Sequence, residues 1–179
     1  MARNKYAKDY TLTEYTDRKG KVRTGYRYIG CTYTYIEDSK TVASAKKRLL
    51  ICLLLGWVFA VAALLPRSGA MHTLYVVLPA AVCLAPLVIL TDMTVSVLRL
   101  KQPFEHRHFD RINNNFPGAC FILCLFAGFS LLGEVSVLAR ADVRTSGDVV
   151  FTVCMAALLG AGIGAFRRGK KLRLQVLPS

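Results

Sequence analysis

The chain has 179 residues, of which 54% are hydrophobic and 20% are charged, and its formal net charge is +13. The mean hydropathy is nevertheless positive, at +0.38. The charges crowd into the first 48 residues, one internal stretch and the last dozen residues, and the rest of the chain forms long apolar runs. This segregation excludes an ordinary soluble globular domain, a disordered chain and a disulfide-stapled secreted module, and it indicates a multi-span membrane protein.

The first 38 residues predict a β-hairpin. Residues 10–16 and 22–35 are rich in Tyr, Thr, Val and Ile, which favour strands. Between them, residues 17–20 (Asp-Arg-Lys-Gly) favour a turn, because Asp bonds its own backbone and Gly accepts a positive φ. Gly30 is expected to form a bulge that divides the second run and leaves a short third strand over residues 31–36.

This hairpin needs a surface to pack on, because an isolated hairpin is only marginally stable in water. The sequence leaves two main alternatives: a cap docked on the chain's own helices, or a binding site for a partner protein or for lipid headgroups. A base-stacking surface is disfavoured, and no nucleic-acid partner is expected. The candidate contacts for a partner or for headgroups are Arg23, Tyr26, Arg27 and Tyr28.

Four apolar runs are long enough to cross a bilayer, whose hydrocarbon core needs about 20 residues in a helix. With their flanking residues, the spans are expected at about 46–65, 71–98, 116–139 and 149–166. The first run begins too late for a cleavable signal peptide and is expected to remain as a span. The expected fold is therefore an all-α integral membrane protein: a four-transmembrane-helix bundle within residues 39–179, with a small cytoplasmic N-terminal β-hairpin within residues 1–38.

The distribution of basic residues predicts the orientation. The segment before the first span, the loop between spans two and three and the C-terminal tail, counted together with Asp92 at the same end of span two, hold 21 of the 24 basic residues and 8 of the 11 acidic ones. Because Lys and Arg stay on the cytoplasmic side, both termini and the middle loop are expected there, in a cell membrane with anionic headgroups on that side. The loops at residues 66–70 and 140–148 are then expected outside.

Residues 103–113, between spans two and three, predict a short cytoplasmic interfacial helix ended by three asparagines, and a basic C-terminal tail is expected after the fourth span. This stretch contains Glu105, His106, His108 and Asp110, which are residue types that bind divalent metals or transfer protons. No second pair of metal-ligating residues is expected on the same side of the membrane. Solvated surface charge is therefore favoured, and no metal site and no cofactor are expected.

Asp92 and Glu134 are the two acidic residues that fall inside the expected spans, where ionisable groups are functional candidates. They are candidates for ion or proton coupling. Asp92 lies late in span two and Glu134 late in span three, so they are expected near opposite faces of the membrane. A salt bridge is the alternative interpretation of each, with Arg99 as the partner of Asp92 and Arg140 as the partner of Glu134.

Span four contains a ridge of small residues, Ala156, Gly160 and Gly164, at every fourth position. Such ridges let helices approach closely in lipid, and packing within the bundle is favoured over a seam between two copies of the chain. In span two, Pro79 and Pro86 are expected to kink the helix.

The sequence contains no enzyme signature: it lacks a nucleophile elbow, an HExxH motif and paired carboxylates at one depth. Its six cysteines form no CxxC pair, and no structural disulfide is expected. Two hypotheses remain. The first is a non-enzymatic accessory or scaffold subunit of a membrane complex, with a membrane or cytoplasmic protein partner. The second is a small ion- or proton-coupled transporter or channel that works as a homo-oligomer.

Overall fold

The computed structural model describes residues 7–16, 21–65, 73–100, 102–140, 145–170, 172 and 174–177. Most of these residues are helical, and four helical segments are long and apolar enough to cross a membrane. A small β-hairpin precedes them. The helical fold class and the N-terminal hairpin predicted from the sequence are thus confirmed, and the apolar helices agree with a multi-pass membrane protein.

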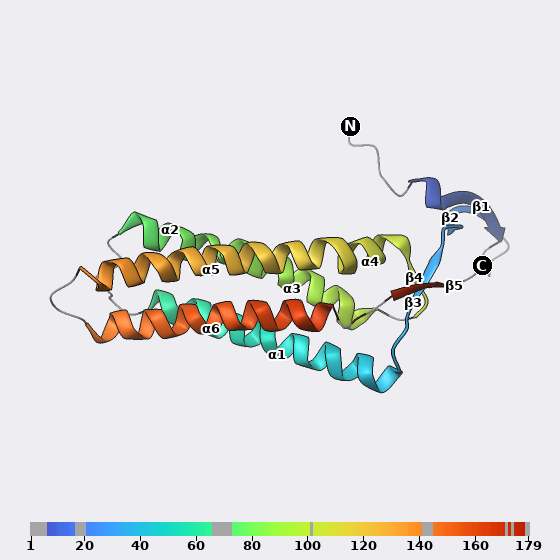
Figure 1. Ribbon diagram of the computed structural model, residues 1–179. Helices are drawn as coiled ribbons and strands as arrows, with labels where there is room; N and C mark the ends of the chain where they lie inside the picture. Colours follow the sequence, from blue (N-terminus) through green and yellow to red (C-terminus); the bar gives the residue numbers. More distant parts are fainter. Residues whose placement is uncertain are drawn as a thin grey trace.

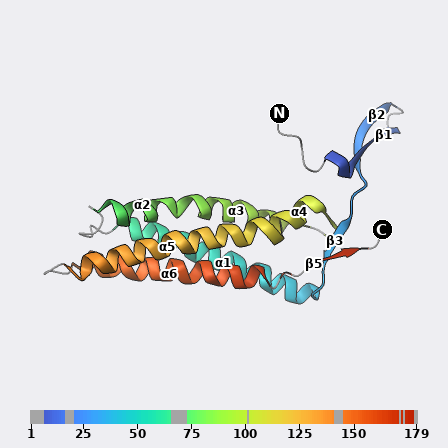
Figure 2. The ribbon, with the colours of Figure 1, turned by 45° about the horizontal axis from the view of Figure 1, so that its top comes forward.

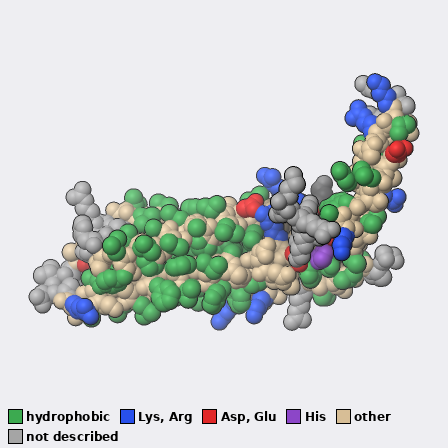
Figure 3. Space-filling model, turned by 90° about the horizontal axis from the view of Figure 1, so that it is seen from above, with side chains coloured by type: hydrophobic (Ala, Val, Ile, Leu, Met, Phe, Trp, Pro, Cys, Tyr) green, Lys and Arg blue, Asp and Glu red, His purple; other side chains and the backbone are tan. Residues whose placement is uncertain are grey.

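The bundle is built from α1 (Ser39–Leu64), the α2–α3 pair (Leu74–Val82 and Leu84–Arg99), α5 (Phe116–Leu138) and α6 (Ser146–Gly169). Helix α1 packs against α3 and α6, and α5 packs against α2, α3 and α6, so neighbours enclose a common core (Figure 1). Because apolar side chains also cover the outside of the helices, the bundle presents the surface that a lipid solvent requires (Figure 3).

The second span is interrupted at Cys83, where α2 ends and α3 begins. Pro86 has no amide hydrogen to donate to the carbonyl of Val82, and the ring of Pro79 lies inside α2. The two prolines thus account for the interruption without a change in the overall direction of the span (Figure 1).

The segment before α5 differs from the separate interfacial helix expected over residues 103–113. Helix α4 (His106–Asp110) continues through a π-helical segment (Arg111–Asn115) directly into α5, and no break separates them. The reason lies at Pro117, which cannot donate to the carbonyl four residues earlier. The wider π turn accommodates that missing bond, so the three asparagines do not end the helix.

The hairpin consists of β1 (Tyr10–Thr16) and β2 (Val22–Tyr28), paired antiparallel with Leu12 opposite Tyr26. A short 3-10 helix (Ala7–Asp9) precedes it. The turn expected at residues 17–20 lies outside the described residues. The hairpin stands away from the helices at one end of the bundle (Figure 2).

A second, three-stranded sheet closes that end of the bundle, which we call the sheet end. Its central strand β3 (Thr32–Tyr35) pairs antiparallel with β4 (Phe104–Glu105) on one side and with β5 (Leu174–Leu177) on the other. The third strand expected near residues 31–36 therefore exists, but it pairs with the middle segment and with the C-terminal tail. Most of the visible Lys and Arg side chains lie toward the sheet end (Figure 3).

The sheet end has a hydrophobic cluster of its own, separate from the core between the helices. Its buried members come from β3, β4, three helical elements and the tail. They are Tyr33, Tyr35, Val42, Ala45, Val97, Phe104, Ile112 and Leu172. Because burial of apolar area is the main stabilising contribution in water, this cluster holds together the segment before α1, the segment between α3 and α5, and the C-terminal tail.

Candidate functional site

The hairpin is attached to the middle segment through two tyrosines at its root. The hydroxyl of Tyr10 donates to the carboxylate of Glu105. The hydroxyl of Tyr28 accepts from the amide of His106 at 2.9 Å and donates to the carbonyl of Cys31 at 2.7 Å. The two tyrosine rings meet edge to face, with centroids 5.3 Å apart. These contacts fix the position of the hairpin relative to the sheet end.

These contacts favour the neutral form of both tyrosines. The hydrogen bond to the Glu105 carboxylate raises the pKa of Tyr10 to about 12, and burial adds to this effect. Burial also raises the pKa of Tyr28, although the hydrogen bond from the amide of His106 lowers it in part. At neutral pH both hydroxyls therefore keep the proton that they donate.

The outer part of the hairpin presents an apolar face. Leu12 is 65% exposed, Val22 is 66% exposed and Tyr26 is 78% exposed. Residues directly opposite each other in an antiparallel pair project to the same face of the sheet, and successive positions alternate. The register therefore puts these three side chains on one face, together with the anchored Tyr10 and Tyr28. The same face carries three polar residues, Glu14, Thr16 and Thr24, and the pair of Glu14 and Thr24 separates Leu12 and Tyr26 from Val22.

The other face of the hairpin is basic. Arg23 lies opposite Tyr15 and Arg27 lies opposite Thr11, and both arginines are exposed. A Cβ added at Gly25 would lie 2.8 Å from the ring of Tyr15, so only glycine leaves room for that ring. Of the four residues predicted as partner or headgroup contacts, Tyr26 thus lies on the exposed apolar face, Arg23 and Arg27 lie on the basic face, and Tyr28 lies at the root.

Leu12, Val22, Tyr10 and Glu105 are the residues of this site that the sequence prediction missed. The available signal was the alternation of side chains along the strands, but it depends on the exact register. Five residues separate Thr16 from its partner Val22. A loop one residue shorter would place Leu12 opposite Gly25 and move it to the basic face.

The histidine-rich middle segment forms part of this root. The ring of His106 stacks on Tyr33 with centroids 5.7 Å apart, and its nitrogens lie 3.6 Å from Asp9 and 3.9 Å from Asp110. Within the described residues, no group of three or more His, Cys, Asp or Glu side chains is arranged to hold a metal ion. Glu105 is engaged with Tyr10 instead.

Asp92 lies at the sheet end and forms an ion pair with Arg111. Its side chain is 65% exposed, and the same guanidinium also donates to Ser96 at 3.0 Å. The sequence favoured Arg99 as the partner. Arg111 takes that place because the helical turns before α5 continue without a break and bring it beside the last turns of α3.

Glu134 lies near the opposite end of the bundle, and its surroundings differ from those of Asp92. It is fully buried, and neither carboxylate oxygen has a hydrogen-bond partner among the described residues. One turn earlier, Ser130 donates to the carbonyl of Val76 at 3.0 Å. Arg140, the partner expected from the sequence, is exposed and forms no ion pair with Glu134. A buried carboxyl group without a partner is costly and marks a functional candidate.

The expected ridge of small residues on α6 lies largely on the outside of the bundle. Ala156 and Gly160 are exposed, and nothing lies within 4 Å of a Cβ added at Gly160. At Gly164 an added Cβ would meet the sulfur of Cys52 on α1 at 3.4 Å. Helix α6 packs closely against α5 at Gly162 instead, where an added Cβ would lie 2.8 Å from the sulfur of Cys124.

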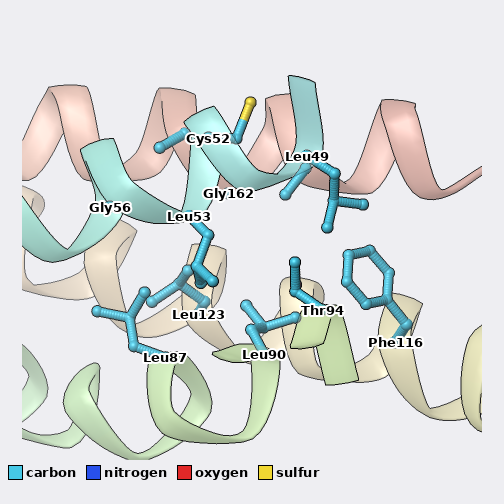
Figure 4. A pocket seen from close by; sticks show the side chains of 12 residues that line it. Leu49, Cys52, Leu53, Gly56, Leu87, Leu90, Thr94, Phe116, Leu123 and Gly162 are labelled. Atoms are coloured by element: carbon cyan, nitrogen blue, oxygen red, sulfur yellow. The ribbon is translucent and has the colours of Figure 1, made fainter. Parts of the chain in front are cut away.

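The core between the helices is closely packed. Figure 4 shows the side chains around a void between α1, α3, α5 and α6, with Leu53, Leu87 and Leu123 converging on it. The void has a volume of about 10 Å³, and its lining is apolar apart from Thr94. That volume corresponds to about one water molecule, so the void does not accommodate a substrate.

Comparisons of the chain with protein-family models, with curated proteins and with solved structures found no match.

Proposed function

We propose that this protein is a non-enzymatic accessory or scaffold subunit of a membrane complex, and that its hairpin is the element that binds a partner protein. The proposal includes insertion in a cell membrane with both termini on the cytoplasmic side. The positive-inside distribution of Lys and Arg supports this orientation, since the N-terminal segment, the middle segment and the tail are the basic parts of the sequence.

The observation that carries the proposal is the apolar face of the hairpin, formed by Leu12, Val22 and Tyr26. These side chains are exposed although the root of the same hairpin is held in place by hydrogen bonds. Full burial of a large apolar side chain is worth about 1.5–3 kcal/mol, so these three residues are the largest source of binding free energy that the hairpin offers. A fixed root also lowers the entropy lost when a partner binds.

The partner that fits this face is a protein with an apolar patch of its own. Both edges of the two-stranded sheet are open among the described residues, so a strand of the partner could extend the sheet while its side chains cover the apolar face. The basic face then remains available to anionic headgroups.

The test is affinity purification of the tagged protein from its native membranes in mild detergent, followed by mass spectrometry of stoichiometric partners. Tyr26→Ala and Leu12→Ala should each lower recovery of the partner about tenfold or more, since each removes most of one apolar side chain that the partner would bury. Arg27→Ala is the matched control on the other face and should leave recovery unchanged. Equal recovery with Tyr26→Ala and with the unchanged protein would contradict the proposal.

A second candidate function is ion- or proton-coupled transport, and the burial of Glu134 without a partner among the described residues favours it. In proteoliposomes, Glu134→Gln should then abolish flux. Asp92→Asn, which changes a carboxylate that is already exposed and ion-paired, should retain flux. Absence of flux in the unchanged protein, or equal flux in the Glu134→Gln variant, would rule this function out.

A further inference from the structure

A groove between α5 and α6 runs along the outside of the bundle. It has a volume of about 180 Å³ and is lined by Cys120, Phe121, Cys124, Ile163 and Phe166. All five side chains are apolar or thiols, and Phe121 and Ile163 are exposed on its rim. Because these residues belong to two of the membrane-spanning helices, the groove opens at the depth of lipid acyl chains.

A wider hollow lies at the sheet end, next to the last turn of α6. Its volume is about 360 Å³. The residues around it are Ile36, Ile112, Asn113, Pro117, Gly169, Lys170, Leu172 and Leu174. The two polar side chains among them, Asn113 and Lys170, both carry hydrogen-bond donors.

The groove and the hollow follow the same two helix faces. On the α5 side, Asn113 and Pro117 line the hollow and Phe121 lines the groove, at a spacing of four residues. On α6, Phe166 lines the groove and Lys170 lines the hollow, one turn apart. The ammonium of Lys170, which lines the hollow, lies over the ring of Phe166, which lines the groove, 4.6 Å from its centroid.

The charge that lines these two adjacent spaces is positive. Neither lining contains an aspartate or a glutamate among the described residues. The Lys170 ammonium offers three donor hydrogens. The side-chain amide of Asn113 donates one hydrogen to Asn114 at 3.1 Å and has a second hydrogen for another acceptor.

We infer that these two spaces together form a binding site for one anionic phospholipid. An acyl chain lies in the α5/α6 groove, and the headgroup phosphate accepts hydrogen bonds from Lys170 and Asn113 in the hollow. A free phosphate would leave the apolar groove unoccupied, and a peptide would have unsatisfied backbone groups at membrane depth. A phospholipid fills the apolar groove with an acyl chain and places its phosphate beside the donors of the hollow. The site lies on α5 and α6, away from the hairpin, so it rests on the membrane insertion included in the proposed function but not on the hairpin's binding of a partner.

The first experiment is native mass spectrometry of the purified full chain in detergent, titrated with phosphatidylglycerol or with phosphatidylcholine of the same acyl chains. One phosphatidylglycerol should be retained per chain at concentrations at which phosphatidylcholine is lost. Lys170→Ala should weaken retention about fivefold, the effect expected for one lysine contact to an anionic lipid. Arg167→Ala removes the same charge from the same turn of α6 but lies outside both linings, and it should have no effect.

A second pair of variants tests the apolar half. Ile163→Trp fills the groove from its exposed rim and should lower retention of phosphatidylglycerol. Val153→Trp makes the same kind of change at another exposed position of α6, outside the groove, and should not. Equal losses for Lys170→Ala and Arg167→Ala, equal retention of the two lipids, or an unchanged Ile163→Trp would each overturn the inference, provided that the variants unfold at the same temperature as the unchanged protein.

Discussion

Among the carboxylates at the two ends of the bundle, Glu134 is the exception: even Asp148, buried at the far end, accepts hydrogen bonds from the amide and the hydroxyl of Thr145. At the sheet end, Asp92 has an ion pair with Arg111 and Glu105 accepts a hydrogen bond from Tyr10. Near the far end, Glu134 is fully buried and its oxygens have no hydrogen-bond partner among the described residues. The sheet end therefore satisfies these two carboxylates, and the buried hydroxyl of Tyr35 is the polar atom there without a hydrogen-bond partner among the described residues.

This difference separates polar groups that stabilise the fold from a polar group that is a candidate for function. Hydrogen-bonded polar groups contribute to the stability of the fold. A buried polar group without a partner lowers that stability, and such groups in membrane proteins are found mainly where they have a function. Substitutions at the sheet end should then destabilise the fold, while replacement of Glu134 should stabilise it. Four predictions test this contrast.

The largest effect is expected from Tyr33→Ala. Tyr33 is buried, and its ring stacks on Phe109 with centroids 4.4 Å apart and on His106. Its removal leaves a cavity in the sheet-end cluster and should lower the free energy of unfolding by about 3–5 kcal/mol. Denaturant unfolding in detergent measures this effect. Tyr26→Ala, at an exposed position, is the control and should change stability by less than about 0.5 kcal/mol; similar losses in both variants would contradict the picture of a packed sheet end.

The next effect has opposite signs at the two ends. Glu134→Met removes a buried carboxyl group without a described partner and should raise the free energy of unfolding by about 1–3 kcal/mol. Asp92→Asn weakens an exposed ion pair and should lower the same free energy by at most about 1 kcal/mol. Thermal unfolding of both variants in one detergent gives the comparison, and a destabilised Glu134→Met would show that the carboxyl group makes a stabilising contact.

Glycine substitutions on α6 test how tightly the sheet end is packed. A Cβ added at Gly169 would lie 2.7 Å from the ring of Phe116, which is buried at the start of α5. Gly169→Ala should therefore lower the free energy of unfolding by about 1–3 kcal/mol. At the open position, Gly160→Ala should cost nothing and should gain up to about 1 kcal/mol from helix propensity. The prediction fails if the two variants unfold at the same denaturant concentration.

The smallest effect is a pH dependence at the hairpin root. The neutral hydroxyl of Tyr10 donates to Glu105, so the stabilisation from this bond is fully present below the ordinary tyrosine pKa of about 10. Since the pKa in the folded protein is about 12, the stabilisation should disappear as the pH rises from about 10 to 12. The ultraviolet absorbance of tyrosinate measures this titration. Tyr10→Phe should reduce its late component by one tyrosine, and the remainder belongs to Tyr35, because burial also raises the pKa of Tyr35 to about 12. An unchanged late component would assign the shift to another residue.

Hydropathy is sufficient to predict the four helices, because a run of about 20 apolar residues has few other uses in a protein. The hairpin is predictable for a similar local reason, since two strand-favouring runs flank turn-forming residues. The different environments of Tyr26 and Tyr28 were not predictable. Both residues lie on the same face of β2, and only the distant position of His106 decides that Tyr28 is anchored while Tyr26 is exposed.

The three-stranded sheet could not be predicted for the same reason. The basic residues of the tail hide the short apolar alternation of β5, and a strand of four residues gives little signal by itself. Its pairing with β3 depends on the helices, which bring two distant segments to one end of the bundle. Glu134 shows the converse: its position in a span was visible in the sequence, but its lack of a described partner required the packing around it.

The order of the strands has a consequence for biosynthesis. β3 is synthesised before the first helix, whereas β5 follows the last one, so the ribosome must complete all four helices before β3 acquires its second neighbour. Until then one edge of β3 is bare, and bare edges are the surfaces through which nascent chains aggregate or are captured by chaperones. A chain stalled before α6 therefore differs from a completed one in that the edge of β3 that pairs with β5 is still exposed.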